Sequence, residues 1–383
     1  MSGERILVLN PGSSSLKASL VEAPDRTLAR ADVSWGSDAS RASERARSIE
    51  SVLAELGADG GGVEGAEGID AVGYRVVHGG DRFTSAVLID EEVIVGIESV
   101  RDLAPLHNGV ALDTIRAGRA LMPGITHVAC FDTAFHATLS ADAFRYPVPA
   151  RWYSEWGVRR YGFHGLSVEW SVRRAAELLG QDADDLRLVV AHLGSGCSVT
   201  AVDAGRSVDT SMGLTPLEGL MMGTRSGSID PGAILSVLDR GLLSAAAIAE
   251  DLEHGSGLLG VSGVSGDMRE LQATADTGDA RSGLAIAMFV RRAASAIAAA
   301  ATSLPTLDAL VFTGGIGEHA SEVRGSIVAR LGVLGVTPLP QGDVDEGDHV
   351  LGEEGGSVAV LRVEAREDLV IAAEAADLVP DRS

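Results

Sequence analysis

Short apolar runs, which predict buried strands, alternate along the chain with the three- and four-residue apolar spacing of helices. The first run, residues 6–9, ends in a polar turn, and a second apolar run covers 16–21. Further strands are predicted at 72–77, 128–131, 188–191, 199–202, 309–313 and 358–362, and helices at 109–121, 167–179, 245–253, 280–302, 321–330 and 368–378. This mixture predicts helices layered on mixed sheets, an α/β fold.

One strand–turn–strand unit occurs twice. The turn after residues 6–9 contains Gly12-Ser13, and the turn after 188–191 contains Gly194-Ser195. The repeat predicts a duplicated α/β domain whose two hairpins face each other across a cleft. Coincidence between common turn residues is the alternative. Residues 341–356 are polar and contain glycine, so we expect a surface loop there.

Composition narrows the class of protein. A chain of 383 residues fits two domains, and a net charge of −23 argues against a nucleic-acid partner. The most apolar stretch, 284–304, is interrupted by Arg291 and Arg292, so a core helix is expected and no membrane segment. The first ten residues have a strand pattern without a basic start, and only two cysteines occur. We therefore expect a cytoplasmic protein.

The only lysine among 31 basic residues is Lys17, at the end of the turn that starts at Asn10. One interpretation is that codon drift replaced lysine by arginine elsewhere in the chain and left Lys17 by chance. The functional interpretation is a compact ammonium that contacts phosphate as a point charge. Because serine hydroxyls and turn amides surround it, the hairpin offers several donors to phosphate oxygens.

Four further segments present groups suited to phosphate or carboxylate chemistry. Arg75 ends a predicted strand and Asp132 ends another, although a salt bridge and a helix cap are the ordinary alternatives. His164 lies between glycines, and Arg225 lies on a glycine-bounded turn as a phosphate clamp requires. Residues 314–318 form a glycine turn before a helix, where backbone can approach a ligand or simply pack.

Together these segments resemble the acetate kinase family, part of the superfamily of sugar kinases, actin and the Hsp70 ATPase domain. The similarity runs over nearly the whole chain in the family's order. It is carried by LVLNPGSSSLK, RVVHGG, LAPLHN, FDTAFH, RRYGFHG, HLGSG, SVDTSMGLTPLEGLMMGTRSG, the segment 267–269 and FTGGIGE. It implies duplicated ribonuclease-H-like (actin-like ATPase) domains: 1–134 with about 368–383 on the carboxylate and metal side, and 135–367 on the nucleotide side.

The resemblance also implies residue roles. Asn10 and Glu367 would hold Mg²⁺, which Mn²⁺ replaces. The catalytic group would be Asp132, His164, Arg225 and Arg75. The carboxylate pocket would be Arg75, Val77, Leu106, Phe163 and Pro216. ATP or ADP would contact Ser13, Ser15, Lys17, His192, Leu193, Gly194, Ser195, Gly196, Asp267, Met268, Arg269, Gly315, Ile316, Gly317, Glu318 and His319.

Five positions depart from the family pattern. Leu166 and Val168 replace the common Thr and His, while Ser195 and His319 replace Asn in the nucleotide motifs. Arg366 stands before Glu367 where Asn is common, which bears on the metal site. None of these changes removes a predicted catalytic group.

The sequence therefore predicts acetate kinase, with direct in-line transfer of the ATP γ-phosphoryl group to acetate. Propionate kinase is an alternative, because one methylene changes binding by only about 1–3 kcal/mol. A nucleotide-driven conformational module without an acceptor is a second alternative. The resemblance further implies a homodimer, and no nucleic acid or membrane partner is expected.

Overall fold

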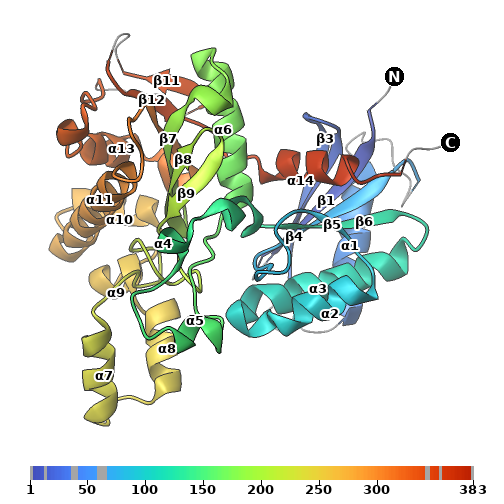
Figure 1. Cartoon of the computed structure of the whole chain (residues 1–383), viewed down its shortest axis with the longest axis horizontal. Helices are drawn as coiled ribbons and strands as arrows, with labels where there is room; N and C mark the ends of the chain where they lie inside the picture. The colour runs from blue at the N-terminus through green and yellow to red at the C-terminus, as the bar shows by residue number, and fades with distance from the viewer. Residues whose placement is uncertain are drawn as a thin grey trace. The chain divides into compact units, whose positions relative to one another are not determined.

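The computed structural model describes residues 3–12, 15–35, 42–57, 67–340, 346–352 and 356–380. Contacts between residues divide the chain into two compact units (Figure 1). Unit 1 comprises Met1–Ala137, Phe163–Leu166 and Arg366–Ser383, and unit 2 comprises Thr138–Gly162 and Ser167–Ala365. Glu367, which the sequence analysis assigned to the second domain, lies in unit 1 because it begins a helix that packs there.

Unit 1 is built on a sheet of strand order β3-β2-β1-β4-β6-β5. Its strands are β1 (Arg5–Pro11), β2 (Ser15–Glu22), β3 (Arg26–Ser34), β4 (Ala71–Val76), β5 (Val87–Leu88) and β6 (Thr126–Phe131). Its helices are α1 (Ala42–Leu56), α2 (Glu91–Ser99), α3 (Pro105–Leu121) and α14 (Glu367–Ala376). β1–β2–β3 are antiparallel, whereas β4 and β6 run parallel to β1.

Successive residues of β4 show how helices cover both faces of this sheet. A Cβ at Gly73 would lie 2.6 Å from Ile371 of α14, so that helix packs directly on the backbone. The next residue, Tyr74, points the other way and closely approaches Gly118 of α3. Side chains alternate along a strand, so α14 and α3 lie on opposite faces (Figure 1). Most of the core lies between the sheet and α1, α2 and α3.

Unit 2 repeats the arrangement with strand order β11-β12-β10-β7-β8-β9. Its strands are β7 (Arg187–Leu193), β8 (Cys197–Asp203), β9 (Arg206–Thr210), β10 (Ala309–Thr313), β11 (His349–Leu351) and β12 (Ala359–Arg362). Its helices are α4 (Ala141–Phe144), α5 (Arg151–Ser154), α6 (Gly165–Leu179), α7 (Pro231–Asp239), α8 (Ala245–His254), α9 (Gly257–Ser262), α10 (Met268–Asp276), α11 (Ala280–Ala301), α12 (Gly314–His319) and α13 (Ser321–Val328). Figure 1 shows α6 and α11 on opposite faces of this sheet.

The apolar stretch expected to be a core helix is α11. Among the described residues, α11 alone has the length and hydropathy of a membrane span. It packs instead against β7 and β8 and against α9, α10 and α13. The expected core helix is therefore confirmed.

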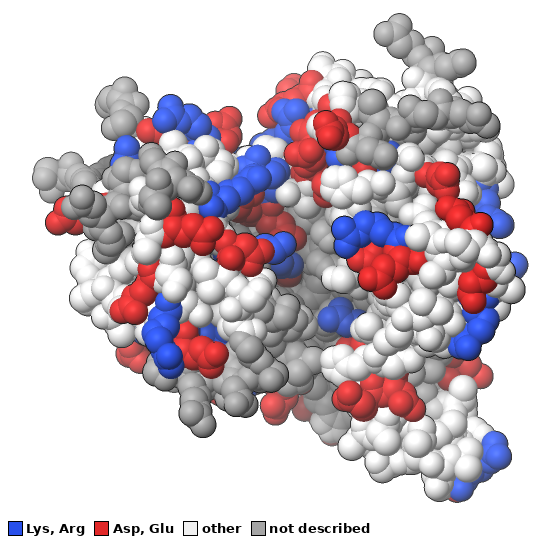
Figure 2. All heavy atoms as spheres, turned by 180° about the vertical axis from the view of Figure 1, so that it is seen from behind, with Lys and Arg blue, Asp and Glu red and all other residues white. Residues whose placement is uncertain are grey.

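Figure 2 shows acidic and basic side chains interspersed on the visible face, without a continuous basic surface among the side chains described there.

Two local predictions are wrong. Residues 341–356 were expected to be a loop, but His349–Leu351 form β11, which pairs with β12; positions 341–345 and 353–355 lie outside the described residues. The glycine turn expected at 314–318 is the helix α12. In the first case pairing with a neighbouring strand overrides a polar sequence, and in the second the helix starts immediately after β10.

Candidate active site

The predicted site residues form two groups, one in each unit. In unit 1, β4 delivers Arg75 and the end of β6 delivers Asp132, since both parallel strands end at the same sheet edge. Arg75 Nε and Nη2 donate to the two carboxylate oxygens of Asp132 over 2.9 and 2.7 Å. The Asp132 side chain is only 2% exposed and that of Arg75 19%. This bidentate geometry fixes both groups in one plane.

Two more residues complete the cluster around Arg75. Arg75 Nη1 lies 2.9 Å from Glu367 Oε2 and 3.4 Å from Asn10 Oδ1. The Asn10 amide in turn donates to Glu367 Oε2 over 3.3 Å. Burial by itself would lower the pKa of Arg75, but the charges of Asp132 and Glu367 and the hydrogen bond to Asp132 raise it above its ordinary value. Arg75 is therefore a permanent cation between two carboxylates.

Asn10 and Glu367 have the chemistry of a magnesium site. Their side-chain oxygens are hard ligands, and Mg²⁺ is commonly held by one or two carboxylates together with water and substrate phosphates. Within the described part of the chain, no group of three or more His, Cys, Asp or Glu residues could hold a metal. The donor set thus fits a cation that takes its remaining ligands from water and phosphate.

His164 is held beside Asp132 by a tight turn. The Gly165 amide donates to the Asp132 carbonyl over 2.8 Å, and a Cβ on Gly165 would lie 2.3 Å from that oxygen. His164 itself has φ 60°, a left-handed conformation that is uncommon for residues other than glycine. Such a conformation persists only where the surroundings enforce it, and it is common at functional sites.

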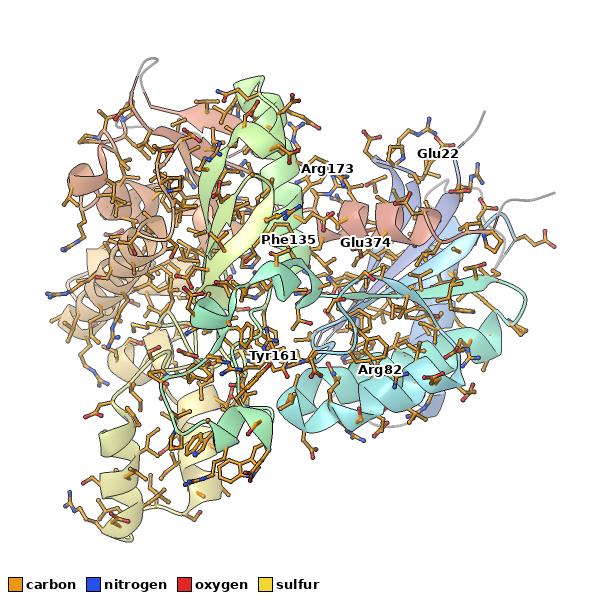
Figure 3. The ribbon with its side chains drawn as sticks, in the orientation of Figure 1. Glu22, Arg82, Phe135, Tyr161, Arg173 and Glu374 are labelled. Atoms are coloured by element: carbon orange, nitrogen blue, oxygen red, sulfur yellow. The ribbon has the colours of Figure 1, made fainter. Side chains whose placement is uncertain are left out.

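The predicted carboxylate pocket is partly described in unit 1. Val77 is half-buried directly after β4, and Phe163 is buried with its ring edge-on to His78 at 5.3 Å between centroids. His136 Nε2 lies 3.0 Å from the Phe163 carbonyl, and Phe135 packs edge-on to His136 in the turn after β6 (Figure 3). The side chain of Leu106, in the first turn of α3, lies outside the described residues.

The first hairpin carries the predicted phosphate contacts of unit 1. Asn10 and Lys17 are opposite each other in the β1–β2 register, and Lys17 is exposed. The Gly12 amide donates to the Ser15 carbonyl over 2.8 Å and closes the turn. Ser13 lies outside the described residues.

In unit 2, the predicted nucleotide turns contact one another through backbone. Gly314 has φ 75°, and a Cβ there would lie 2.9 Å from the Leu193 carbonyl oxygen. The Gly223 amide donates to the Ser195 carbonyl over 3.2 Å, and a Cβ on Gly266 would lie 2.9 Å from the Gly223 oxygen. Glycine at these positions allows four segments of the chain to approach each other more closely than side chains would permit.

The remaining predicted nucleotide contacts surround these turns. His192 Nδ1 lies 2.8 Å from Ser167 Oγ, and the Gly194 amide donates to the Gly196 carbonyl over 3.0 Å. Asp267 caps α10, and its pKa is lowered chiefly by the hydrogen bond from exposed Arg269. The other predicted positions are buried Met268 and the α12 residues Gly315, Ile316, Gly317, Glu318 and His319.

Arg225, also in unit 2, is held at both ends of its guanidinium. Its Nη1 donates to the Pro216 carbonyl over 3.3 Å, and its Nε lies 3.3 Å from Glu253 Oε2. The side chain is 20% exposed. A partly buried arginine tied to the Pro216 turn is a suitable group for neutralising phosphoryl oxygens.

Comparison with known proteins assigns the family. The acetokinase family model matches residues 5–373. The chain belongs to the acetokinase family. An acetate kinase of Deinococcus deserti is 47% identical in an alignment of 386 positions that covers 96% of each chain. An acetate kinase of Deinococcus radiodurans is 44% identical over 98% of each chain.

Solved structures of the acetokinase family agree with the fold. The crystal structure of Porphyromonas gingivalis acetate kinase has a TM-score of 0.89 at 36% identity and covers 99% of this chain and 100% of its own. A propionate kinase from Francisella tularensis gives a TM-score of 0.86, also at 36% identity, over 97% of this chain and 98% of its own. The predicted resemblance and the duplicated α/β fold are confirmed.

Sequence reasoning missed several groups that hold the acetokinase site in place. Asn108 exchanges hydrogen bonds with the backbone of His78 at 3.1 and 2.9 Å, and Thr133 Oγ1 accepts from the Gly79 amide at 3.0 Å. Glu253 pairs with Arg225. Asn108 and Thr133 lie inside the motifs LAPLHN and FDTAFH, so the motif was the available signal, whereas nothing local marks Glu253.

Proposed function

We propose that this acetokinase catalyses the reversible transfer of the γ-phosphoryl group of ATP to acetate, giving acetyl phosphate and ADP. The observation that supports it best is Arg75, a partly buried cation held by Asp132 and Glu367 at the carboxyl ends of the unit 1 strands. A carboxylate acceptor needs a fixed cation that matches its planar geometry, and an arginine in this setting supplies one.

The proposed mechanism relies on positioning and charge. A carboxylate is already nucleophilic at neutral pH, so Asp132 has no proton to remove and instead orients Arg75 through two hydrogen bonds. In this scheme Arg75 binds the acceptor, while His164 and Arg225 stabilise the charge on the transferred phosphoryl group. Transfer then proceeds directly in line, without an enzyme-bound phosphate.

Mg²⁺, when bound, would neutralise negative charge on the phosphate oxygens of ATP. Asn10 and Glu367 would hold it, and Mn²⁺ would replace it. Lys17, the two predicted hairpin serines, the glycine turns of unit 2, the segment 267–269 and α12 would bind ATP or ADP through ammonium, hydroxyl and backbone groups.

Propionate is the second candidate acceptor. The Francisella tularensis structure named a propionate kinase is as similar to this chain in sequence, at 36% identity, as the Porphyromonas gingivalis acetate kinase. The apolar side chains proposed to contact the acceptor, Val77, Leu106, Phe163 and Pro216, would decide between the two acids. One methylene is worth only about 1–3 kcal/mol, so both substrates can be used at different rates.

A hydroxamate assay with C2 to C4 acids tests the assignment, because hydroxylamine traps acyl phosphates. The expected result is acyl hydroxamate that depends on ATP and Mg²⁺, with the highest kcat/KM for acetate. A higher kcat/KM for propionate would reassign the acceptor. Absence of product with every acid, in protein that binds ATP, would favour a nucleotide-dependent conformational module.

We also propose a homodimer and a cytoplasmic location. The helices α7 and α8 extend from the rest of unit 2, and α7 has no buried residue (Figure 1). Large apolar side chains are exposed there: Ile229 41%, Leu235 58%, Leu242 56% and Leu243 39%. Such a surface suits a second copy of the chain, and sedimentation of a Leu235→Glu variant as a monomer would support it. Cytoplasmic ATP and the thiol state of both cysteines fit the location.

A further inference from the structure

The segment 211–219 of unit 2 has no helix or strand, yet most of it is half-buried. It begins where β9 ends and contains Pro216, whose carbonyl accepts from Arg225. An irregular segment needs partners for its backbone polar groups, because it has no ladder of its own. Side chains from 146 and 160, earlier in the chain, supply these partners.

Arg160 holds the start of this segment. Its Nη1 donates to the carbonyls of Thr210 and Met212 over 2.8 and 3.0 Å, and its Nη2 donates to Glu218 Oε1 over 2.9 Å. The Arg160 side chain is 16% exposed. One cation therefore ties together two points of the backbone, Thr210 and Met212, and the far end of the same segment at Glu218.

Tyr146 makes a second connection across the segment. Its hydroxyl donates to Glu218 Oε2 in a short hydrogen bond and accepts from the Leu214 amide over 3.0 Å. Burial, followed by the neighbouring Glu218 carboxylate, raises the pKa of Tyr146, so the hydroxyl keeps its proton. The neighbouring backbone adds support, since the Tyr161 amide donates to the Gly213 carbonyl over 3.0 Å (Figure 3).

Gly213 shows how closely these groups surround the backbone. A Cβ at this position would lie 1.8 Å from Glu218 Oε2 and 2.1 Å from the Tyr146 hydroxyl. Both polar groups therefore rest directly on the main chain of the segment. Three side chains, each bonded to the next or to the backbone, fix the loop that carries Pro216.

We propose that Tyr146, Arg160 and Glu218, here called the loop clamp, are positioning residues that set the place of Pro216 and, through its carbonyl, of Arg225. The proposal rests on the proposed function, in which Pro216 contacts the acceptor. The clamp acts through the loop, by fixing where Pro216 stands. A displaced Pro216 is expected to change discrimination between acetate and longer acids.

The test compares Tyr146→Phe with the matched control Tyr153→Phe, which removes the same hydroxyl from a nearby ring outside the clamp. Losing the bonds to Glu218 and Leu214 is expected to raise the KM for acetate about tenfold. The KM for ATP should stay within about twofold, and the ratio of acetate to propionate kcat/KM should fall. An acetate KM equal to that of Tyr153→Phe in folded protein would overturn the proposal.

A second variant and a substrate-free measurement separate this proposal from the assigned activity. Glu218→Gln should raise the acetate KM similarly, and the double variant should be little worse than either single one, because both act on one unit. Hydrogen exchange over 211–219 should quicken about tenfold in Tyr146→Phe and not in Tyr153→Phe. Unchanged hydrogen exchange in Tyr146→Phe would overturn the loop clamp, whatever the activity of the variant. Wild-type protein that forms no acyl phosphate would overturn only the proposed function.

Discussion

The two sheets have the same order and direction of strands, but different residues lie at the ends of those strands. Reading the second sheet from β9 reproduces the order of the first from β3, with antiparallel hairpins at one side and parallel strands in the centre. The hairpin turns differ by one residue: the Gly12 amide donates to the carbonyl of Ser15, three residues on, at 2.8 Å, and the Gly194 amide donates to that of Gly196, two residues on, at 3.0 Å. The plan of strands is therefore the same twice, although the turns are not.

The residues that follow the strands are not the same. In unit 1 the ends of β1, β4 and β6 carry Asn10, Arg75 and Asp132, joined by charge and hydrogen bonds. In unit 2 the end of β10 is followed by Gly314, which packs on the backbone of Leu193. One sheet end is thus specified by fixed charges and the other by close backbone approach. The two units therefore present different chemistry on a common scaffold.

Removing the positive charge of Arg75, at the carboxyl ends of the unit 1 strands, should have the largest effect on activity and stability. Arg75→Ala is expected to lower kcat/KM for acetate by about 10³ while changing the KM for ATP little. It also leaves Asp132 and Glu367 without their cation, which should cost about 3–5 kcal/mol in free energy of unfolding. Steady-state kinetics and urea unfolding measure the two effects.

Arg82→Ala is the control for Arg75. Arg82 is exposed and pairs with Glu92 on the surface (Figure 3), so its loss should change stability by less than about 1 kcal/mol and leave turnover unchanged. Arg75→Lys keeps the charge and loses the two-pronged geometry, and it should recover stability better than activity. Equal kinetics for Arg75→Ala and Arg82→Ala would refute the charged site.

The second sheet end is tested by adding a methyl group. Gly314→Ala forces a side chain into φ 75° and against the Leu193 backbone, so we expect a loss of about 2–4 kcal/mol in stability and a raised KM for ATP. Gly325→Ala, in α13 with nothing within 4 Å of the new Cβ, should be neutral or slightly stabilising. Thermal unfolding measures the stability of both variants, and ATP titration measures their affinity for ATP. Equal values for Gly314→Ala and Gly325→Ala would contradict the prediction.

The fold was largely predictable because buried strands and the core helix leave strong local patterns. The apolar runs at 6–9, 188–191 and 309–313 lie within β1, β7 and β10, and 280–302 contains α11. β3, β9 and β11 were missed. They are outer strands of their sheets and contain polar or exposed residues, so neighbouring strands, and not their own pattern, determine them.

The candidate site was predictable only as a set of residues. The family resemblance proposed Arg75, Asp132 and Glu367 but carried no information on their hydrogen bonds, which join positions 57 and 357 residues apart in the chain. The same limit explains why Glu218 and Tyr146 went unnoticed, since their bond spans 72 residues. Long-range partners follow from the fold, not from the local sequence.

A change at Glu367, in the unit 1 cluster, should have a smaller effect, on the affinity for Mg²⁺. Glu367→Gln removes the carboxylate proposed as a metal ligand and retains the shape of the side chain, so the Mg²⁺ concentration for half-maximal rate should rise about tenfold. Mn²⁺ binding followed by water-proton relaxation gives a readout independent of turnover. Glu374→Gln, later on the same helix (Figure 3), should leave both values unchanged. Unaltered Mn²⁺ binding in Glu367→Gln would remove Glu367 from the proposed site.

The smallest effect concerns pH. It again distinguishes the sheets, because β6 buries His127 beside Val72 of β4, whereas β12 has the apolar Val360 beside Leu310 of β10. Burial lowers the pKa of His127 below 6.5, despite its bond to the Met122 carbonyl, while Tyr74 occupies the other ring nitrogen. The unfolded chain then takes up this proton first as pH falls. The contribution of His127 to stability is therefore complete above about pH 6.5 and declines below it. Urea unfolding at pH 7.5, 6.5 and 5.5 should show the stability gap between wild type and His127→Gln narrowing with acid, and a gap that stays constant would contradict the assignment.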